Sequence, residues 1–159
     1  MVKKEVILSL EGMQRLEQEL NHLKSVRRQE VADRIRQARA FGDISENSEY
    51  ENAKNDQAFL EGRIIALEKI LRNARVLDES EISTEKVSVG CKVTLKDVEN
   101  GDLQEYTIVH STEADPAAAK ISDESPVGHA LIGHRVGETI QVRTPVGTFG
   151  YEVLAINPR

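Results

Sequence analysis

Two acidic residues, Asp43 and Glu46, lie three positions apart in a short polar stretch between two long segments of helical character. At the start of a helix this spacing is typical of a capping box, in which both side chains bind backbone N–H groups of the first turn. Carboxylates are also ligands of Mg²⁺, which takes one or two of them and fills its other positions with water and phosphate oxygens. The pair therefore predicts a helix cap, or part of a Mg²⁺ site that another protein completes as the second ion of a phosphoryl-transfer centre. A capping carboxylate keeps a lone pair free, so the two roles are compatible.

Two segments without proline and with coiled-coil periodicity flank these acids. The first runs from about residue 11 to residue 41, and its apolar pattern slips around Arg27; its seam is Met13, Leu16, Leu20 and Leu23, then Val31, Ile35 and Ala38. The second keeps strict four-three spacing through Ala53, Gln57, Leu60, Ile64, Leu67, Leu71 and Ala74. Two helices of roughly 30 residues joined by a turn predict an antiparallel hairpin about 45 Å long. The acidic turn, residues 42–50, would form its tip.

Charge is distributed unevenly along the chain. Residues 1–78 carry 14 basic and 14 acidic side chains, whereas residues 79–159 carry 7 basic and 13 acidic ones, so the net charge of −6 belongs to the second half. We therefore expect the second half to repel nucleic acid and to bind a protein surface. Six basic residues in the first helical segment predict either a face for phosphate groups or only a solvated helix surface: Lys24, Arg27, Arg28, Arg34, Arg36 and Arg39.

The pattern changes from helix to strand in the second half. Residues 78–84 are polar and predict a linker. Ser125 followed by Pro126 predicts the N-cap and first position of a short helix that runs to about Leu131 and stops at Gly133. Alternating apolar residues predict strands over 87–95, 106–110, 139–143 and 149–156. The fold class predicted is α+β, with a coiled-coil hairpin over 1–77 and a β domain with one short helix over 85–159.

Composition narrows the possible functions. Aromatic residues make up only 4% and tryptophan is absent, so aromatic pockets and base-stacking surfaces are not expected. We expect neither a signal peptide nor a membrane span, because no apolar run is long enough. The single cysteine, Cys91, excludes an internal disulfide and fits a reducing cytoplasm, as a small apolar residue in a strand. The four histidines share no metal-ligand spacing: His22, His110, His129 and His134.

Three separated motifs resemble the Gre family of bacterial transcript cleavage factors. The first is Gly42-Asp43-Ile44-Ser45-Glu46-Asn47-Ser48-Glu49-Tyr50, followed by Phe59-Leu60-Glu61-Gly62-Arg63-Ile64. The second covers 113–115, 121–128 and 130–133, and the third is Thr144-Pro145-Val146-Gly147. The resemblance covers essentially the whole chain in order. Of the two branches of the family, GreA and GreB, the modest basic patch favours GreA.

The resemblance implies a fold and a mechanism. The coiled coil would enter the secondary channel of RNA polymerase, and a C-terminal domain of FKBP-like fold would dock at the rim, on the largest subunit. Asp43 and Glu46 match the acids that hold the second Mg²⁺ jointly with the polymerase, which then cleaves the 3′ end of backtracked nascent RNA. The chain would thus be a monomeric cytoplasmic factor, not an enzyme, and would bind no metal tightly alone.

The resemblance also assigns roles to further residues. At the tip, Ser45, Asn47 and Tyr50 would shape the loop and contact the polymerase. Arg28, Arg36 and Arg39 would face RNA or polymerase, and the docking segment would contain Ser122, Asp123, Ser125 and Pro126, whose pattern is equally explained by a helix cap.

Three other function classes are open to test. A regulator that occupies the channel without cleavage would resemble the inhibitory relatives of the family, but those depart at the tip, where Asp43 and Glu46 are both present. A prolyl isomerase needs an aromatic-lined pocket, and the second half offers only Tyr106, Phe149 and Tyr151. A coiled-coil scaffold would not explain the clustered acids.

Overall fold

The computed structural model describes residues 5–40 and 48–158 of the chain. Contacts divide the chain into two compact units. The first contains residues 13–74 with the segment up to Val6, and the second contains residues 7–12 and 75–159. We call them the hairpin unit and the sheet unit.

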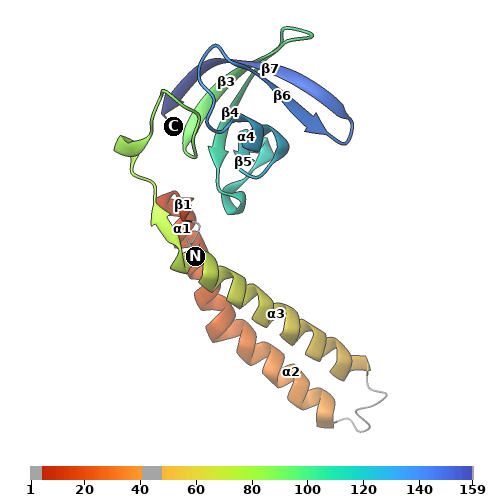
Figure 1. The fold of residues 1–159 in the computed structure, drawn as a ribbon. Helices are drawn as coiled ribbons and strands as arrows, with labels where there is room; N and C mark the ends of the chain where they lie inside the picture. Colours follow the sequence, from red (N-terminus) through yellow and green to blue (C-terminus); the bar gives the residue numbers. More distant parts are fainter. Residues whose placement is uncertain (1–4, 41–47, 159) are drawn as a thin grey trace. The chain divides into compact units, whose positions relative to one another are not determined.

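The hairpin unit is built from two helical arms. The first arm comprises α1 (Leu10–His22), a π-helical segment (Leu23–Arg27) and α2 (Arg28–Ala40). The second arm is α3 (Ser48–Arg72), which runs antiparallel beside α2 (Figure 1). Asp43, Ser45, Glu46 and Asn47 lie outside the described residues. The predicted helical hairpin is confirmed, although α3 ends at Arg72 and the expected seam residue Ala74 lies in a strand.

The predicted apolar seam forms the core of the hairpin. Its buried members come from both arms: Val31, Ile35, Ala53, Leu60 and Ile64. Leu20, Leu23 and Tyr50 pack against them and are partly buried. Each helix buries one stripe, as expected of an amphipathic helix in a two-helix hairpin.

The slip in the heptad pattern coincides with the π-helical segment Leu23–Arg27. Before it the seam residues are spaced by three and four up to Leu23, and a continued heptad would next reach positions 27 and 30. The seam instead resumes at Val31, one residue late. A π turn holds one more residue than an α turn, so it takes up the extra residue and returns the seam to the partner helix.

A small sheet joins the two ends of the hairpin arms. Strand β1 (Val6–Leu8) pairs with β2 (Ala74–Val76). Next to these strands, the N–H of Val6 donates to the carbonyl of Asn73 at 2.9 Å, and the N–H of Leu77 donates to that of Leu8 at 2.7 Å. Neither strand was predicted from the sequence, because a strand of three residues is too short to show an alternating pattern.

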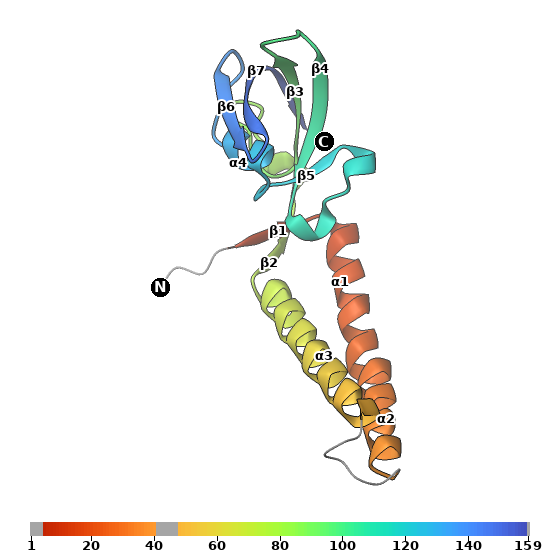
Figure 2. The ribbon, with the colours of Figure 1, turned by 90° about the vertical axis from the view of Figure 1, so that its right-hand side faces the viewer.

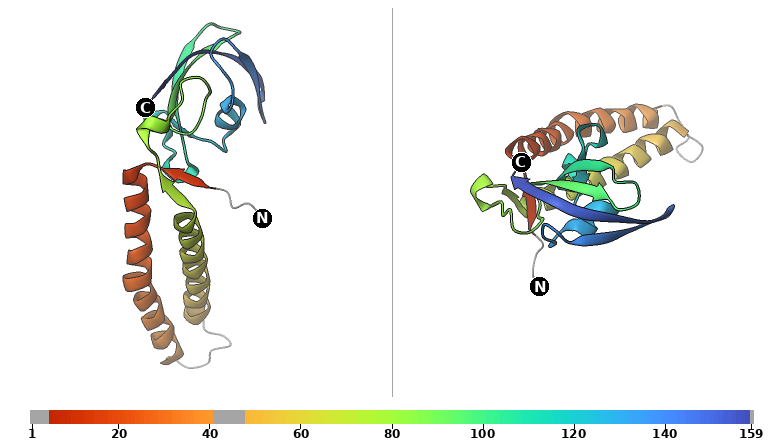
Figure 3. Two further views of the ribbon diagram at one scale, coloured as in Figure 1. Left: turned by 60° about the vertical axis from the view of Figure 1, so that its left-hand side comes forward. Right: turned by 90° about the horizontal axis from the view of Figure 1, so that it is seen from above.

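The sheet unit contains a five-stranded mixed sheet in the order β5-β4-β3-β7-β6. The strands are β3 (Cys91–Asp97), β4 (Leu103–Val109), β5 (Lys120–Ser122), β6 (Thr139–Thr144) and β7 (Gly147–Pro158). Only the β4–β5 pair is parallel, and the register of β3 with β7 shifts between Thr94 and Leu95. Figure 2 and Figure 3 show the sheet curling around the short helix α4 (Pro126–Leu131).

The core of the sheet unit lies between the curled sheet and α4. Its buried residues are Val87, Cys91, Val93, Leu95, Ile108, Leu131, Ile140, Val142, Val153 and Ile156. Cys91 lies in a strand, as the sequence predicted, and is the first residue of β3; its thiol donates to the carbonyl of Ser83 at 3.3 Å. Val87 and Val89, predicted to lie in a strand, instead lie in the irregular segment before β3, where Val87 is buried. The polar stretch 78–84 contains a 3₁₀ turn (Glu79–Glu81).

Candidate functional site

The described residue closest in sequence to the two candidate metal ligands is Ser48, where α3 begins. The connection from Ala40 to Ser48 contains both Asp43 and Glu46. The first turn of α3 adds two acids, Glu49 and Glu51, which its macrodipole favours. The sequence thus concentrates carboxylates on this connection and on the helix start that follows it.

Tyr50 closes the core of the hairpin next to that connection. Its side chain packs against the buried cluster, and the Arg39 guanidinium carbon lies 5.8 Å from the centroid of its ring. A cation over an aromatic face is attractive at this distance. Tyr50 and Arg39, which the sequence assigned to the tip and to the basic face, therefore bind each other across the two helices.

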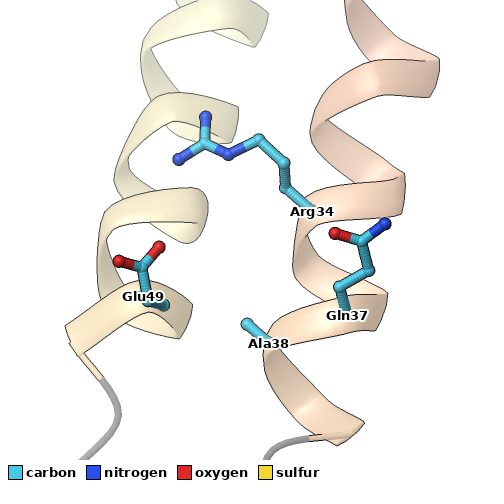
Figure 4. A pocket seen from close by; sticks show the side chains of 4 residues that line it. All are labelled: Arg34, Gln37, Ala38 and Glu49. Atoms are coloured by element: carbon cyan, nitrogen blue, oxygen red, sulfur yellow. The ribbon is translucent and has the colours of Figure 1, made fainter.

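A small cavity of about 170 Å³ lies between the arms near their connection. Arg34, Gln37 and Ala38 line it from α2, and Glu49 lines it from α3 (Figure 4). Arg34 reaches across to α3, where its Nη1 lies 2.6 Å from Oδ2 of Asp56. This cavity could not be predicted from the sequence, because its walls come from two arms that are separate in the chain.

Ion pairs between the arms neutralise much of the basic flank. Arg28 binds Glu61 through two parallel N–H···O contacts of 2.9 Å each. The hydrogen bond with Glu61 raises the pKa of Arg28, and the same bond lowers the pKa of Glu61. Lys24 lies 3.4 Å from Glu68. Asp56 and Glu61 of α3 thus pair with basic residues of the first arm.

The three arginines of the predicted basic face are therefore not equivalent. Arg28 is held by Glu61, and Arg39 lies over Tyr50. Arg36 pairs with Asp33 of its own helix at 3.2 Å, and its side chain is 74% exposed. Arg36 is the member of the three whose charge is most accessible to a partner.

The predicted docking segment forms one compact turn between β5 and α4. Ser125 Oγ accepts from the N–H of Gly128 at 3.1 Å and donates to the carbonyl of Ser122 at 2.6 Å, so the predicted helix cap is confirmed. The N–H of Asp123 donates to the carbonyl of Val109 at 2.9 Å. A Cβ on Gly128 would lie 2.0 Å from the carbonyl oxygen of Ser122, so the turn requires glycine there. Pro126 is exposed at the first helical position.

A second helix cap within the sheet unit was not predicted from the sequence. The N–H of Ser9 donates to Glu113 Oε2 at 3.0 Å, its hydroxyl donates to Glu113 Oε1, and the N–H of Gly12 donates to Ser9 Oγ at 3.0 Å. Glu113 thus places a carboxylate at the start of α1. The partners lie 104 residues apart, and no local pattern connects them.

The described part of the chain contains no group of three or more His, Cys, Asp or Glu side chains that could hold a metal ion. Within the same ranges, no helix is long and apolar enough to cross a membrane.

Comparison with known proteins gives a consistent result over the whole chain. The family model described as "Transcription elongation factor, N-terminal" matches residues 6–76, and that described as "Transcription elongation factor, GreA/GreB, C-term" matches residues 82–158. The chain is 57% identical to the transcription elongation factor GreA of Acetivibrio thermocellus, with 96% of both chains covered. It is 56% identical to that of Caldanaerobacter subterraneus, with 98% of this chain and 99% of the relative covered.

Among solved structures, the chain is similar to GreA factor homolog 1 (Gfh1) of Thermus thermophilus. The two are 36% identical, 97% of this chain and 99% of that chain are covered, and the TM-score is 0.45.

Proposed function

Because the chain belongs to the GreA/GreB family of transcription elongation factors, we propose that it stimulates cleavage of backtracked RNA by bacterial RNA polymerase. The observation that carries the proposal is the helical hairpin whose connection contains Asp43 and Glu46. With 25 residues, α3 alone is about 37 Å long at 1.5 Å per residue. Such a hairpin would carry its carboxylates through the secondary channel to a buried active site.

The two carboxylates fit Mg²⁺, which prefers oxygen ligands and takes few of them from any one protein. They are too few to hold the ion without the polymerase, whose own carboxylates and RNA phosphate would complete the shell. The chemistry that Mg²⁺ supplies there is orientation and activation of a water next to the RNA phosphodiester. Asp43 and Glu46 would bind and position the ion. The polymerase would cleave the phosphodiester bond, so the chain is not itself an enzyme.

The sheet unit would provide the docking surface. Residues 79–159 carry the whole net charge of −6, which suits a basic rim on the largest subunit. The turn between β5 and α4 offers a rigid surface for this contact, because the Ser125 cap and the close packing of Gly128 fix its backbone. The acting form would be a single copy in the cytoplasm, with the nascent RNA 3′ end as its second contact.

Transcript cleavage in a halted, backtracked elongation complex at limiting Mg²⁺ tests this function. The wild type should shorten the RNA from its 3′ end, and an Asp43→Asn/Glu46→Gln double variant should bind the complex without cutting. A Glu11→Gln/Glu17→Gln variant removes the same charge from exposed positions of α1 and should cut like the wild type.

Each of three other results would favour one alternative over the proposed function. If the wild type binds and does not cut, the chain is a non-cleaving regulator that occupies the channel. If the double variant loses binding as well, the division between a cleaving hairpin and a docking sheet unit is wrong. If the double variant still cuts, the two acids are only helix caps.

A further inference from the structure

The outer face of α3, opposite the hairpin core, is apolar where solvent-facing positions of a coiled coil ordinarily carry charge. Five residues form this outer stripe: Ala58, Phe59, Gly62, Ile65 and Ala66. All five are exposed, Phe59 to 81% and Ile65 to 67%. The face turned to α2 carries the buried residues Ala53, Leu60 and Ile64. The hairpin therefore leaves a second apolar surface of α3 uncovered.

Gly62 lies at the centre of this stripe and has no function in the hairpin itself. A Cβ at this position would meet nothing within 4 Å, and the backbone is helical. Glycine in the middle of a helix lowers stability relative to alanine, because it loses more conformational entropy on folding. A glycine at an exposed helical position allows the close approach of another backbone, which the hairpin itself does not supply here.

The stripe is symmetric about Gly62 in sequence. Ala58 and Ala66 lie four residues on either side of it, and Phe59 and Ile65 lie three residues on either side. A second α3 placed antiparallel, with the two glycines opposite each other, would bring Phe59 of each copy against Ile65 of the other. This is the self-complementary pattern that an interface with twofold symmetry requires.

The charges at the two ends of α3 agree with this arrangement. Glu51 lies eleven residues before Gly62, and Lys69 and Arg72 lie seven and ten residues after it. Among the residues that the structure describes, none of these three side chains has an ion-pair partner. In the antiparallel pair, Glu51 would lie beside Lys69 and Arg72 of the second copy, and the two helix dipoles would oppose each other.

We infer that the outer stripe of α3 is a self-association surface, and that its partner is a second copy of this chain bound antiparallel about Gly62. The stripe covers about 12 Å of helix, from Ala58 to Ala66. A contact of that length buries far less than the surface of about 800 Å² per partner in a standard stable interface. The association is therefore weak and depends on concentration, so a single copy remains available to act on a larger partner. This inference is independent of the proposed role in transcription.

Sedimentation equilibrium of the full-length chain, from micromolar to millimolar concentration, tests the proposal. The average mass should rise with concentration from 17.7 kDa towards twice that value. Gly62→Gln should weaken association at least tenfold, because its side chain has open space in the single chain but would separate the two helices of the pair. Phe59→Gln should have a similar effect. Leu103→Gln is the matched control, since Leu103 of β4 is 65% exposed and lies off the stripe.

A charge exchange tests the antiparallel arrangement itself. Glu51→Lys should weaken association, and the double variant Glu51→Lys/Arg72→Glu should restore it; circular dichroism checks that the helices remain. The proposal is overturned if the wild type stays at the mass of one chain at millimolar concentration, or if the Gly62 and Phe59 variants associate as the wild type does. It is also overturned if the wild type stays single while Phe59→Gln loses binding to RNA polymerase, because the stripe would then belong to the polymerase interface.

Discussion

The two units of this protein stabilise themselves in different ways. The sheet unit encloses a continuous core, in which Cys91, Val93, Leu95, Ile108, Leu131 and Val153 have no exposed surface. The hairpin unit has two layers of helix and can bury only one stripe from each arm, with Ile35 and Leu60 retaining 9% and 7% exposure. Across its surface it adds ion pairs such as Arg28 with Glu61 and Arg34 with Asp56.

The difference arises because a two-helix hairpin shields its apolar side chains from water less completely than a curled sheet does. A sheet that curls around a helix shields its apolar side chains on all sides, whereas two helices leave both edges of their seam open to water. Pairs on those edges gain little free energy each, because solvent screens them. The stability of the hairpin should therefore depend on salt concentration more than that of the sheet unit does. Four substitutions test this comparison.

The largest effect is expected in the core of the sheet unit. Leu95→Ala removes a fully buried side chain from β3 and should lower the free energy of unfolding by about 4 kcal/mol, since the enclosed cavity cannot collapse. Urea denaturation followed by a probe in the sheet unit measures this loss. A loss below about 1 kcal/mol would mean that the core is not closely packed.

The same chemical change in the hairpin should cost less. Leu60→Ala should lower the free energy of unfolding by about 2 kcal/mol, at the low end for buried leucine, because its site at the open seam can relax and admit water. Helical circular dichroism in urea gives the value. An equal cost at Leu60 and Leu95 would contradict the contrast between an open seam and a closed core.

Loss of a single polar contact in the sheet unit should lower the free energy of unfolding by less than either core substitution. Ser125→Ala removes the cap of α4 and should cost about 1 kcal/mol. Ser125→Thr keeps both the acceptor for the N–H of Gly128 and the donor to the carbonyl of Ser122, and is the matched control. If the alanine and threonine variants unfold at the same urea concentration, the cap does not stabilise the turn.

The smallest effect is expected at the ion pairs, with a dependence on pH that the cores lack. The hydrogen bond from Arg28 lowers the pKa of Glu61 below its ordinary value near 4.5, so the stabilisation is present above that pH and is lost as the pH falls through the lowered pKa. Glu61→Gln should destabilise the hairpin slightly at neutral pH and low salt, and should match the wild type in acid or in high salt. Thermal unfolding by circular dichroism across pH detects this; a difference that persists in acid would assign the effect to packing.

The sequence predicted the hairpin well because its determinants are local and periodic. The seam through Val31, Ile35, Leu60 and Ile64 follows directly from heptad spacing. The slip predicted near Arg27 coincides with the π-helical segment, although a π-helix was not itself predicted. The cap at Ser125 was predicted for the same reason, since an N-cap and proline at the first position are adjacent in the chain.

Contacts between distant segments could not be predicted in this way. Strand β5 is only three residues long and pairs in parallel with β4, so it shows no alternation and no turn signal. Glu113 was not paired with Ser9, and the ion pairs of Asp56 with Arg34 and of Glu61 with Arg28 were not predicted. The role of Asp43 and Glu46 as metal ligands stays a prediction, because both lie outside the described residues.

The π-helical segment Leu23–Arg27 has a consequence for how this protein can change during evolution. Each residue of an α-helix turns the chain by about 100°, so one inserted residue would normally rotate all later side chains off their partner. Here the extra residue is confined to a single wide turn. A chain from which one residue of this segment is deleted would restore an unbroken heptad from Met13 to Ala38, with the same side chains facing α3. The segment is thus a place where the arm can lose a residue without repacking, whereas a deletion within α2 would displace the seam.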